Sequence, residues 1–542
     1  MQNHEQYYRA SGYWSDRLLT DFLQQAVQQS PDKLAVKDPR FGSLTYQQLA
    51  TQSWRLAAVL KNCGVKQGDR FVVALPNWQQ VPIFVLALDY LGAVGVHMPI
   101  TGGEREFAGV FAVSGAKGIV VPELLKDKNF VSLVDRAAKD CPQTSIRITV
   151  GSNQKHQGWV AFEELFDDNS LQVDEPKSPA TADDLNCLLF TSGSSGIPKG
   201  VMHSSNTIGA LNTTVAPIYK LDSETIIFMA APLGFSAGYA HGLRLAIYLG
   251  ATLVLQDVWN ADQALETMVR ERASFTLATP TLLDDLLNCK RFAELKTELS
   301  LQLILCGGSY VPATLLQQAQ EKLPNTLTSV IWGMTEGIGT GCRPGTALDK
   351  VVSTDGEAFL GTELKIIDQN GDEIPAGMEG DLLMRGPQQC LGYYANPQLN
   401  EESFLQDRWF RTGDLAVIDS QGYVKITGRR KELIIRGGAN ISPLEIEQAL
   451  IGEPGIGQLA IIGIPDVRLG ERICACLVAN AEGNNPGLED LLEITSRKGL
   501  AKNKWPESLH IIDALPVTAA GKLRRSILQQ QIIEKMTTED TG

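Results

Sequence analysis

A ten-residue segment rich in glycine and hydroxyl groups has the clearest chemical meaning in this sequence. Residues 191–200 read TSGSSGIPKG and directly follow an apolar run at Leu185–Phe190. Glycines let backbone N–H groups come close to a ligand, and hydroxyls and an ammonium add donors, so the segment is typical of a phosphate-binding loop. It is not a Walker loop, because Pro198 directly precedes the lysine. A flexible linker is disfavoured, since a buried-strand pattern leads straight into the segment. The residues expected to contact phosphate are Thr191, Ser192, Gly193, Ser194, Ser195 and Lys199.

Two later segments share this design of an apolar run that ends in small or polar residues. Leu301–Leu305 leads into Cys-Gly-Gly-Ser at 306–309, and Leu327–Ile331 leads into Trp-Gly-Met-Thr-Glu at 332–336. Ligands of open α/β sheets bind beyond the carboxyl ends of the strands. We therefore expect the three loops to converge on one site.

The elements that must position these loops alternate between helix and strand over the first 180 residues. Thr45 and Gln48 form a capping-box pattern ahead of a helix, and a helical stretch at Val81–Leu91 precedes a strand at Ala93–Met98. Such alternation favours parallel α/β architecture. Residues 151–184 are polar and are expected to form a connecting loop with little structure.

The pattern changes near residue 350, where short strands separated by Gly and Asp turns indicate a β-rich subdomain. After Gly428 comes a compact α+β pattern, in which Ser442 and Glu445 form a second capping box ahead of a helix at 443–451. Residues 530–542 are expected to be a frayed tail. The predicted fold class is α/β: a large N-terminal body with two α/β sheets and a β-rich subdomain, followed by a small α+β C-terminal domain.

Charge and composition exclude several classes of function. Lysine and arginine number 48 and aspartate and glutamate 62, so the formal net charge is −14, which disfavours general nucleic-acid binding. No apolar run approaches the roughly 18–20 residues that span a bilayer, and the N-terminal residues lack the apolar core of a signal peptide. We therefore expect a cytoplasmic protein. Nine scattered cysteines without a CxxC pair, and only six histidines, make disulfides and a zinc site unexpected.

The segment at 191–200 resembles the phosphate-loop signature of the AMP-forming acyl-adenylating enzymes, which include acyl-CoA synthetases, stand-alone adenylation domains and luciferases. Five further motifs occur in the order of that family, and the resemblance covers essentially the whole chain. The five are Leu44–Leu49 (LTYQQL), Trp332–Glu336 (WGMTE), Arg411–Leu415 (RTGDL), Gly428–Glu432 (GRRKE) continuing into Arg436–Gly438, and Pro516–Lys522 (PVTAAGK).

The resemblance implies a two-step reaction with ATP, Mg2+ and coenzyme A. A carboxylate would attack the α-phosphate of ATP to give an acyl-adenylate and pyrophosphate, and a thiol would then displace AMP to form a thioester. It also implies two domains, an ATP- and acyl-binding domain at 1–430 and a mobile C-terminal cap at 431–542.

The resemblance assigns roles in nucleotide binding to matching positions. Glu336 would hold Mg2+ against the phosphates, Thr335 would donate to the α-phosphate, and Trp332 would stack on adenine, where most relatives have Tyr. Asp414 would accept hydrogen bonds from the ribose, and Arg429 would contact ribose and phosphate. Further nucleotide contacts are expected from Gly307, Gly308, Ser309 and Gly333.

Catalysis would depend on the C-terminal cap. Lys522 would bridge the carboxylate and the phosphate and stabilise the developing charge. Lys431 matches the hinge about which the cap rotates between the two half-reactions. Gly437 and Gly438 would line the tunnel for the pantetheine arm of coenzyme A.

The acyl pocket is expected to include Phe235, Tyr239 and Ile338, which favour a hydrophobic monocarboxylate. Phe235 stands where relatives often have His, so no proton chemistry is expected at this position. Residues 92–106 resemble the branch that contains cyclohexanecarboxylate and short- to medium-chain acyl-CoA ligases, although His97 stands where Pro is more usual.

Three other functions stay open at this point. The thiol acceptor would be the phosphopantetheine of a carrier protein if the chain is a stand-alone adenylation enzyme. Residues 234–238 match GxSxG, which would make Ser236 the nucleophile of a serine hydrolase, although Pro232 interrupts the strand that such an elbow needs. A non-catalytic binding module is the last possibility. The sequence leaves the acid and the oligomeric state open.

Overall fold

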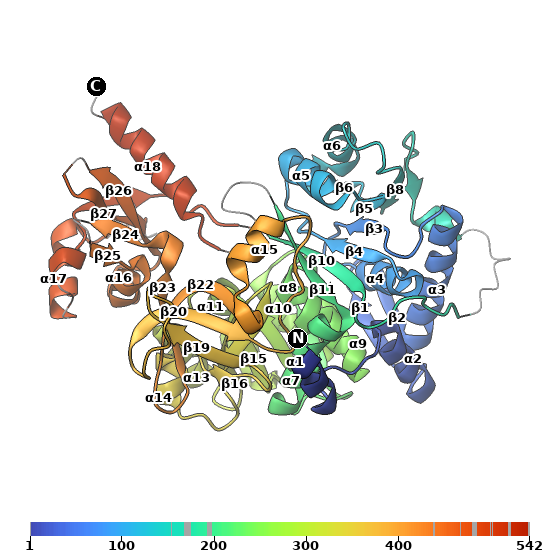
Figure 1. Ribbon diagram of the computed structural model, residues 1–542, viewed down its shortest axis with the longest axis horizontal. Helices are drawn as coiled ribbons and strands as arrows, with labels where there is room; N and C mark the ends of the chain where they lie inside the picture. The colour runs from blue at the N-terminus through green and yellow to red at the C-terminus, as the bar shows by residue number, and fades with distance from the viewer. Residues whose placement is uncertain are drawn as a thin grey trace.

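The computed structural model describes residues 2–152, 154–166, 175–191, 198–436, 439–466, 468–479, 485–498, 500, 502–518 and 522–539. Two large sheets form the N-terminal body, a small antiparallel sheet follows, and a last sheet belongs to a C-terminal domain that lies to one side of the body (Figure 1). This arrangement confirms the predicted fold class.

The larger sheet, here called sheet A, is parallel through its centre and antiparallel at both edges. Helices cross between successive parallel strands, as parallel pairing requires. Its strands are, in spatial order, β18 (Glu357–Ala358), β17 (Gly337–Gly341), β16 (Leu327–Met334), β15 (Leu303–Gly307), β14 (Phe275–Ala278), β12 (Ile226–Met229), β13 (Thr252–Leu255), β1 (Leu34–Asp38) and β2 (Gly42–Thr45). The crossover helices on its later half are α10 (Ala261–Glu271), α11 (Pro280–Asn288), α12 (Phe292–Leu295) and α13 (Ala313–Lys322).

The second sheet, sheet B, carries the strands on both sides of the phosphate-loop motif. β10 pairs in parallel with β4 and antiparallel with β11, so residues 191 and 199 lie opposite each other. Its spatial order is β21 (Gly392–Tyr393), β11 (Lys199–Ser204), β10 (Leu185–Thr191), β4 (Val94–His97), β3 (Arg70–Val73), β5 (Gly118–Pro122), β8 (Ile146–Val150) and β9 (Val160–Ala161). The helices α5 (Glu104–Ser114), α6 (Phe130–Ala137) and α7 (Ser205–Tyr219) accompany these strands.

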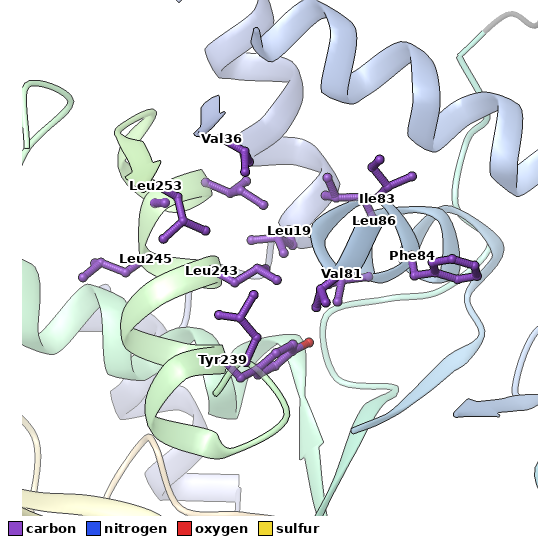
Figure 2. Close-up of a cluster of buried hydrophobic side chains, with 14 of the residues drawn as sticks. Leu19, Val36, Val81, Ile83, Phe84, Leu86, Tyr239, Leu243, Leu245 and Leu253 are labelled. Atoms are coloured by element: carbon purple, nitrogen blue, oxygen red, sulfur yellow. The ribbon is translucent and has the colours of Figure 1, made fainter. Parts of the chain in front are cut away.

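The main core lies where helices are packed between the two sheets. Every residue of α4 (Gln80–Leu91) is buried, which explains why this helix is apolar all round rather than on one face. Figure 2 shows Val81, Ile83 and Leu86 of α4 in one buried cluster with Leu19 of α2 (Leu19–Gln29), and Val81 lies on the side of α4 toward Tyr239 and Leu243 of a π-helical segment at Tyr239–Arg244. The helix α3 (Tyr46–Asn62) packs against α4, and its predicted capping box is confirmed: Thr45 Oγ1 accepts from the backbone N–H of Gln48.

The β-rich subdomain is a four-stranded antiparallel sheet, sheet C, as predicted. Its order is β19 (Glu363–Ile367), β20 (Glu379–Arg385), β22 (Phe410–Ile418) and β23 (Val424–Arg429). The register of β22 and β23 places Asp414 opposite Arg429, so that two motif residues far apart in sequence become neighbours. Helices α14 (Leu348–Ser353) and α15 (Pro397–Ser403) lie in the intervening chain.

The C-terminal domain is an α+β unit with apolar clusters on both faces of its sheet, sheet D. β27 (Gly470–Val478) lies between β26 (Leu459–Asp466) and the parallel strand β28 (Ser508–Ile512). The remaining elements are β24 (Ile434–Arg436), β25 (Ala439–Ile441), α16 (Pro443–Leu450), α17 (Leu488–Arg497) and α18 (Arg525–Glu539). Its buried interior indicates a separately packed unit.

Two local predictions were wrong. Helix α16 begins at Pro443 as expected, but the Ser442 hydroxyl donates to the carbonyl of Thr427 and does not cap the helix. Residues 530–539 belong to α18, where Ile532 is buried, because an apolar stripe of the helix covers sheet D. The described part of 151–184 is mostly loop and turn, as predicted, with β9 and a 3-10 turn at Glu163–Phe166 as its short elements.

Candidate active site

The 332–336 segment lies against β11, the strand that follows the phosphate-loop segment. The imidazole Nε2 of His203 on β11 lies 2.8 Å from the carbonyl oxygen of Thr335, within hydrogen-bond distance. Residues Ser192, Gly193, Ser194 and Ser195 lie outside the described residues. Thr191 and Lys199 are described, and they pair across β10 and β11. The His203 contact lies at the end of β11 away from Lys199, because His203 pairs with Cys187, and the link on the Lys199 side is made by Tyr393.

Tyr393 on β21 links the two segments and was not found by sequence reasoning. Its hydroxyl donates to Glu336 Oε1 at 2.6 Å, and the Lys199 ammonium lies 5.8 Å from its ring centre. Burial and the neighbouring Glu336 both raise the pKa of the Tyr393 hydroxyl, which keeps it a donor. Tyr393 is far from any recognised motif, and only the pairing of β21 with β11 brings it to the site.

Glu336 is suited to hold a divalent cation together with phosphate groups. One carboxylate oxygen is oriented by Tyr393, and the other has no partner among the described residues. No group of three metal-ligating side chains occurs in the part of the chain that is described. A Mg2+ ion held here would therefore take most of its ligands from phosphate oxygens and water, which is its usual preference.

Asp414 is the buried centre of a group that also contains Arg429 and Trp332. Asp414 is only 2% exposed; its Oδ1 lies 3.0 Å from Arg429 Nε, and its Oδ2 accepts from the Trp332 indole N–H at 2.9 Å. Burial raises the pKa of the Asp414 carboxyl, while Arg429, the Trp332 indole and Lys522 act in the opposite direction. Each carboxylate oxygen keeps a second lone pair for a ligand hydroxyl.

Glycines around Trp332 give the indole its place. A Cβ atom on Gly339 would lie 2.2 Å from the six-membered ring of Trp332, so only glycine fits there. A Cβ on Gly333 would lie 2.7 Å from Ile338 Cα, and a Cβ on Gly307 would lie 2.3 Å from the carbonyl oxygen of Ile331. Beyond Gly307, Gly308 has a φ of +89°, which favours glycine, and Ser309 is exposed at the end of β15.

Lys522 reaches this site from the C-terminal domain. It is an exposed residue, yet protein groups surround its ammonium closely enough that burial is the largest cause of a lowered pKa. Arg429 lowers that pKa further, while Asp414, Glu336 and Glu432 act in the opposite direction. The structure therefore places the ammonium within electrostatic reach of both carboxylates of the body. Gly437 and Gly438 lie outside the described residues.

The expected acyl-pocket residues fall into two groups. Phe235 is partly exposed and directly precedes Ser236, whose Oγ lies 3.2 Å from Thr335 Oγ1, so this segment borders the 332–336 segment. Ile338 is buried beside Gly333. Tyr239 is buried in the main core, with its ring centre 4.4 Å from that of His97 (Figure 2).

The surroundings of Ser236 do not form a hydrolase nucleophile site. β12 ends at Met229, well before the serine, so no strand leads directly into the turn. Within the described residues the hydroxyl of Ser236 is hydrogen-bonded to Thr335 and to no imidazole. His241, on the same segment, is fully buried and has no hydrogen-bond partner among the described residues, and burial lowers its pKa to about 4. No helix in the described part of the chain could cross a membrane.

Comparisons with known proteins agree with this geometry. The profile of the AMP-binding enzyme family matches residues 23–394, and that of the AMP-binding enzyme C-terminal domain matches residues 445–522. The chain is 33% identical over 535 residues to a medium-chain fatty-acid–CoA ligase of Escherichia coli (strain K12), covering 98% of this chain and 93% of that protein.

Two further comparisons concern a second relative by sequence and a solved structure. A salicyl-AMP ligase / salicyl-S-ArCP synthetase of Mycobacterium tuberculosis is 31% identical, with 96% of this chain and 92% of that protein covered. ATP-bound MatB from Rhodopseudomonas palustris shares the fold, with a TM-score of 0.84, 24% identity, and 95% and 99% of the two chains covered. The chain therefore belongs to the AMP-binding enzyme family and is an adenylate-forming enzyme of the AMP-forming acyl-CoA ligase group.

Proposed function

We propose that this enzyme converts a hydrophobic monocarboxylate into its coenzyme A thioester through an acyl-adenylate. The observation that carries the proposal is the electrostatic interaction of Lys522 of the C-terminal domain with Glu336 and Asp414 of the body. Charged groups of two domains thus act on one another where, in this proposal, a nucleotide phosphate and a carboxylate would meet.

In the first step, an oxygen of the substrate carboxylate attacks the α-phosphorus of ATP, and the bond to pyrophosphate breaks. Asp414 would accept hydrogen bonds from the ribose hydroxyls, with Trp332 against the adenine and Arg429 near ribose and phosphate. Lys199 and the loop at 191–200 would bind the phosphates that leave. Mg2+ held by Glu336 would neutralise phosphate charge. Lys522 would stabilise the negative charge that develops between carboxylate and α-phosphate.

In the second step, the thiol attacks the acyl carbonyl, its proton is lost, and AMP leaves. We propose that the domain at 431–542 turns about Lys431 relative to the domain at 1–430, which removes Lys522 and opens the approach past Gly437 and Gly438. Arg429 and Arg430 belong to the body side of this boundary. A hinge of this kind lets one site serve two reactions in turn.

The predicted acyl-pocket residues support the choice of acid. Phe235 and Ile338 are apolar and lie beside the segment that carries Thr335, where the carboxylate must be placed. The relationship to a medium-chain fatty-acid–CoA ligase at 33% identity favours an aliphatic acid.

The decisive experiment incubates the protein with ATP, Mg2+, CoA and a panel of aliphatic, alicyclic and aromatic acids. AMP and pyrophosphate should appear together with an acyl-CoA, whereas release of ADP would exclude the proposal. A carrier-protein acceptor is the second candidate, because a relative at 31% identity is named for transfer to an aryl carrier protein. Thioester formation on a carrier protein, with none on free CoA, would select that candidate.

A further inference from the structure

Arg525 lies at the start of α18, three positions after Lys522, and joins two parts of the C-terminal domain. Its Nε donates to Glu432 at 2.9 Å, and its two terminal nitrogens donate to the carboxylate of Glu447 at 2.6 and 2.7 Å. One of them also donates to the carbonyl of Ile461 at 2.6 Å. Burial alone would lower the pKa of Arg525, but Glu447 and Glu432 outweigh it and raise the pKa, so the guanidinium stays charged.

Arg525 binds to residues at the centre of the C-terminal domain. Glu447 is 5% exposed on α16, and one of its oxygens also accepts from the backbone N–H of Ile461 on β26 at 2.7 Å. A planar guanidinium with five donors can satisfy two carboxylates and a carbonyl at once, which a lysine cannot do. Arg525 therefore fixes the start of α18 to the sheet.

Backbone hydrogen bonds also hold the chain around Lys522 near the start of α18. The backbone N–H of Thr518 donates to the carbonyl of Lys522 at 2.7 Å, and that of Arg524 donates to the carbonyl of Pro516 at 2.8 Å. Val517 and Leu523 form an antiparallel bridge. Through Pro516 and Thr518, which lie two positions apart, these contacts join Lys522 to Arg524, the residue before Arg525. A movement of Arg525 therefore also moves Lys522.

The other partner of Arg525 flanks the proposed hinge. Glu432 is the residue after Lys431, while Arg430, the residue before it, makes a two-pronged ion pair with Asp381 on β20 of the body, with Nε at 2.6 Å from Oδ1. Lys431 itself is exposed, and its side chain has no hydrogen bond or ion pair among the described residues. One neighbour of Lys431 is thus held by the body and the other by the C-terminal domain.

We propose that Arg525 is a positioning residue that joins the flank of the hinge to the segment carrying Lys522, so that rotation at Lys431 moves Lys522 as part of one rigid unit. This inference rests on the proposed function of Lys522 and Lys431. Without the Glu432–Arg525 pair, the C-terminal domain still folds around Glu447 and still rotates. The residues that directly follow Lys431 then no longer fix where Lys522 lies at the end of the rotation.

The test compares Glu432→Gln and Arg525→Lys with Arg524→Gln as matched control. Arg524 is exposed, adjacent to Arg525, and has no side-chain partner among the described residues. Acyl-adenylate formation is measured as pyrophosphate release without CoA, and thioester formation is measured separately from supplied acyl-AMP and CoA. Glu432→Gln should lower kcat of the first half-reaction about 10–100-fold, the loss expected for a misplaced catalytic group, with KM for ATP nearly unchanged.

Thioester formation from acyl-AMP and the thermal midpoint should stay at the wild-type value in Glu432→Gln, because Arg525 keeps its bonds to Glu447. Arg525→Lys, which retains a positive charge beside Glu447, should show the same split between half-reactions. Equal loss of both half-reactions, or unchanged adenylation in Glu432→Gln, would overturn the proposal. If Lys522→Ala retained adenylation, the proposed function of Lys522 itself would fail. If Lys522→Ala lost adenylation but Glu432→Gln kept it, only the proposed link between the hinge and Lys522 would fail.

Discussion

Asp414 and Lys522 face the same site from two parts of the chain, and they are held in different ways. Asp414 is almost fully buried, and each of its oxygens has a donor 2.9–3.0 Å away. Lys522 is exposed, and no hydrogen bond of its ammonium is present among the described residues. The Asp414 carboxylate is therefore fixed before any ligand arrives. The Lys522 ammonium is kept near the site only by long-range attraction and by the placement of its domain.

This difference fits the two tasks of an adenylate-forming enzyme. Nucleotide binding benefits from groups that are already oriented, because no ordering cost then falls on the binding step. A charge needed in only one of two half-reactions must be able to leave, and an exposed side chain on a separate domain can do so. The variants below test this division of tasks.

Lys522→Ala should have the largest effect. Loss of a charge directed at the transition state costs about 100–1000-fold in kcat, as for a lost oxyanion donor. We expect that loss in pyrophosphate release from acid and ATP, with KM for ATP changed little. Thioester formation from supplied acyl-AMP should be preserved. A comparable loss in both half-reactions would show that Lys522 is not specific to the first.

Asp414→Asn should affect binding more than turnover. The amide keeps the shape but removes the charge opposite Arg429 and the strong acceptors for ribose hydroxyls. Hydrogen bonds to charged groups contribute about 1.5–3 kcal/mol, which corresponds to about 10–100-fold in KM for ATP. Steady-state kinetics with ATP and with 2′-deoxy-ATP should show that the variant discriminates less between the two nucleotides. Unchanged discrimination between the two nucleotides would show that Asp414 does not bind the ribose.

The sequence was most informative where chemistry imposes a local pattern. The order of elements, the three loops and the four-stranded sheet of the β-rich subdomain follow from hydrophobic runs and turn residues that can be read in the chain. Two motifs identified Asp414 and Arg429 separately, and their pairing became visible only in the register of β22 and β23.

Residues that enter the site through tertiary pairing were missed. Tyr393 and Arg525 carry no motif of their own, because their roles depend on β21 meeting β11 and on α18 covering sheet D. Ser442 illustrates the same limit: its pattern predicts a cap, but a nearer carbonyl on Thr427 takes the hydroxyl. Local preference gives way to tertiary contacts at such positions.

The pH dependence of adenylation should distinguish the two parts of the site again. Lys522 is charged below its pKa, and because that pKa is lowered, the charge is lost at a lower pH than for an ordinary lysine. The kcat/KM for ATP should therefore fall about tenfold per pH unit once the pH exceeds the lowered pKa. Lys522→Arg, whose guanidinium stays charged, should remove this fall even if its maximal rate is lower. A descending limb at the same pH in both proteins would assign the titration to another group.

Ser236→Ala should have the smallest effect and tests the remaining alternative activity. The hydroxyl has Thr335 as its partner at 3.2 Å, and a neutral hydrogen bond contributes only about 0.5–1.5 kcal/mol, so adenylation should fall a few-fold at most. No imidazole activates this serine in the described part of the chain, so a fluorophosphonate probe should label neither the wild-type protein nor the variant. Labelling that Ser236→Ala abolishes would reveal a nucleophile that the geometry does not provide. A loss of adenylation as large as that of Lys522→Ala would instead mean that Ser236 orients Thr335 during catalysis, and the body would then contribute more than preformed binding groups.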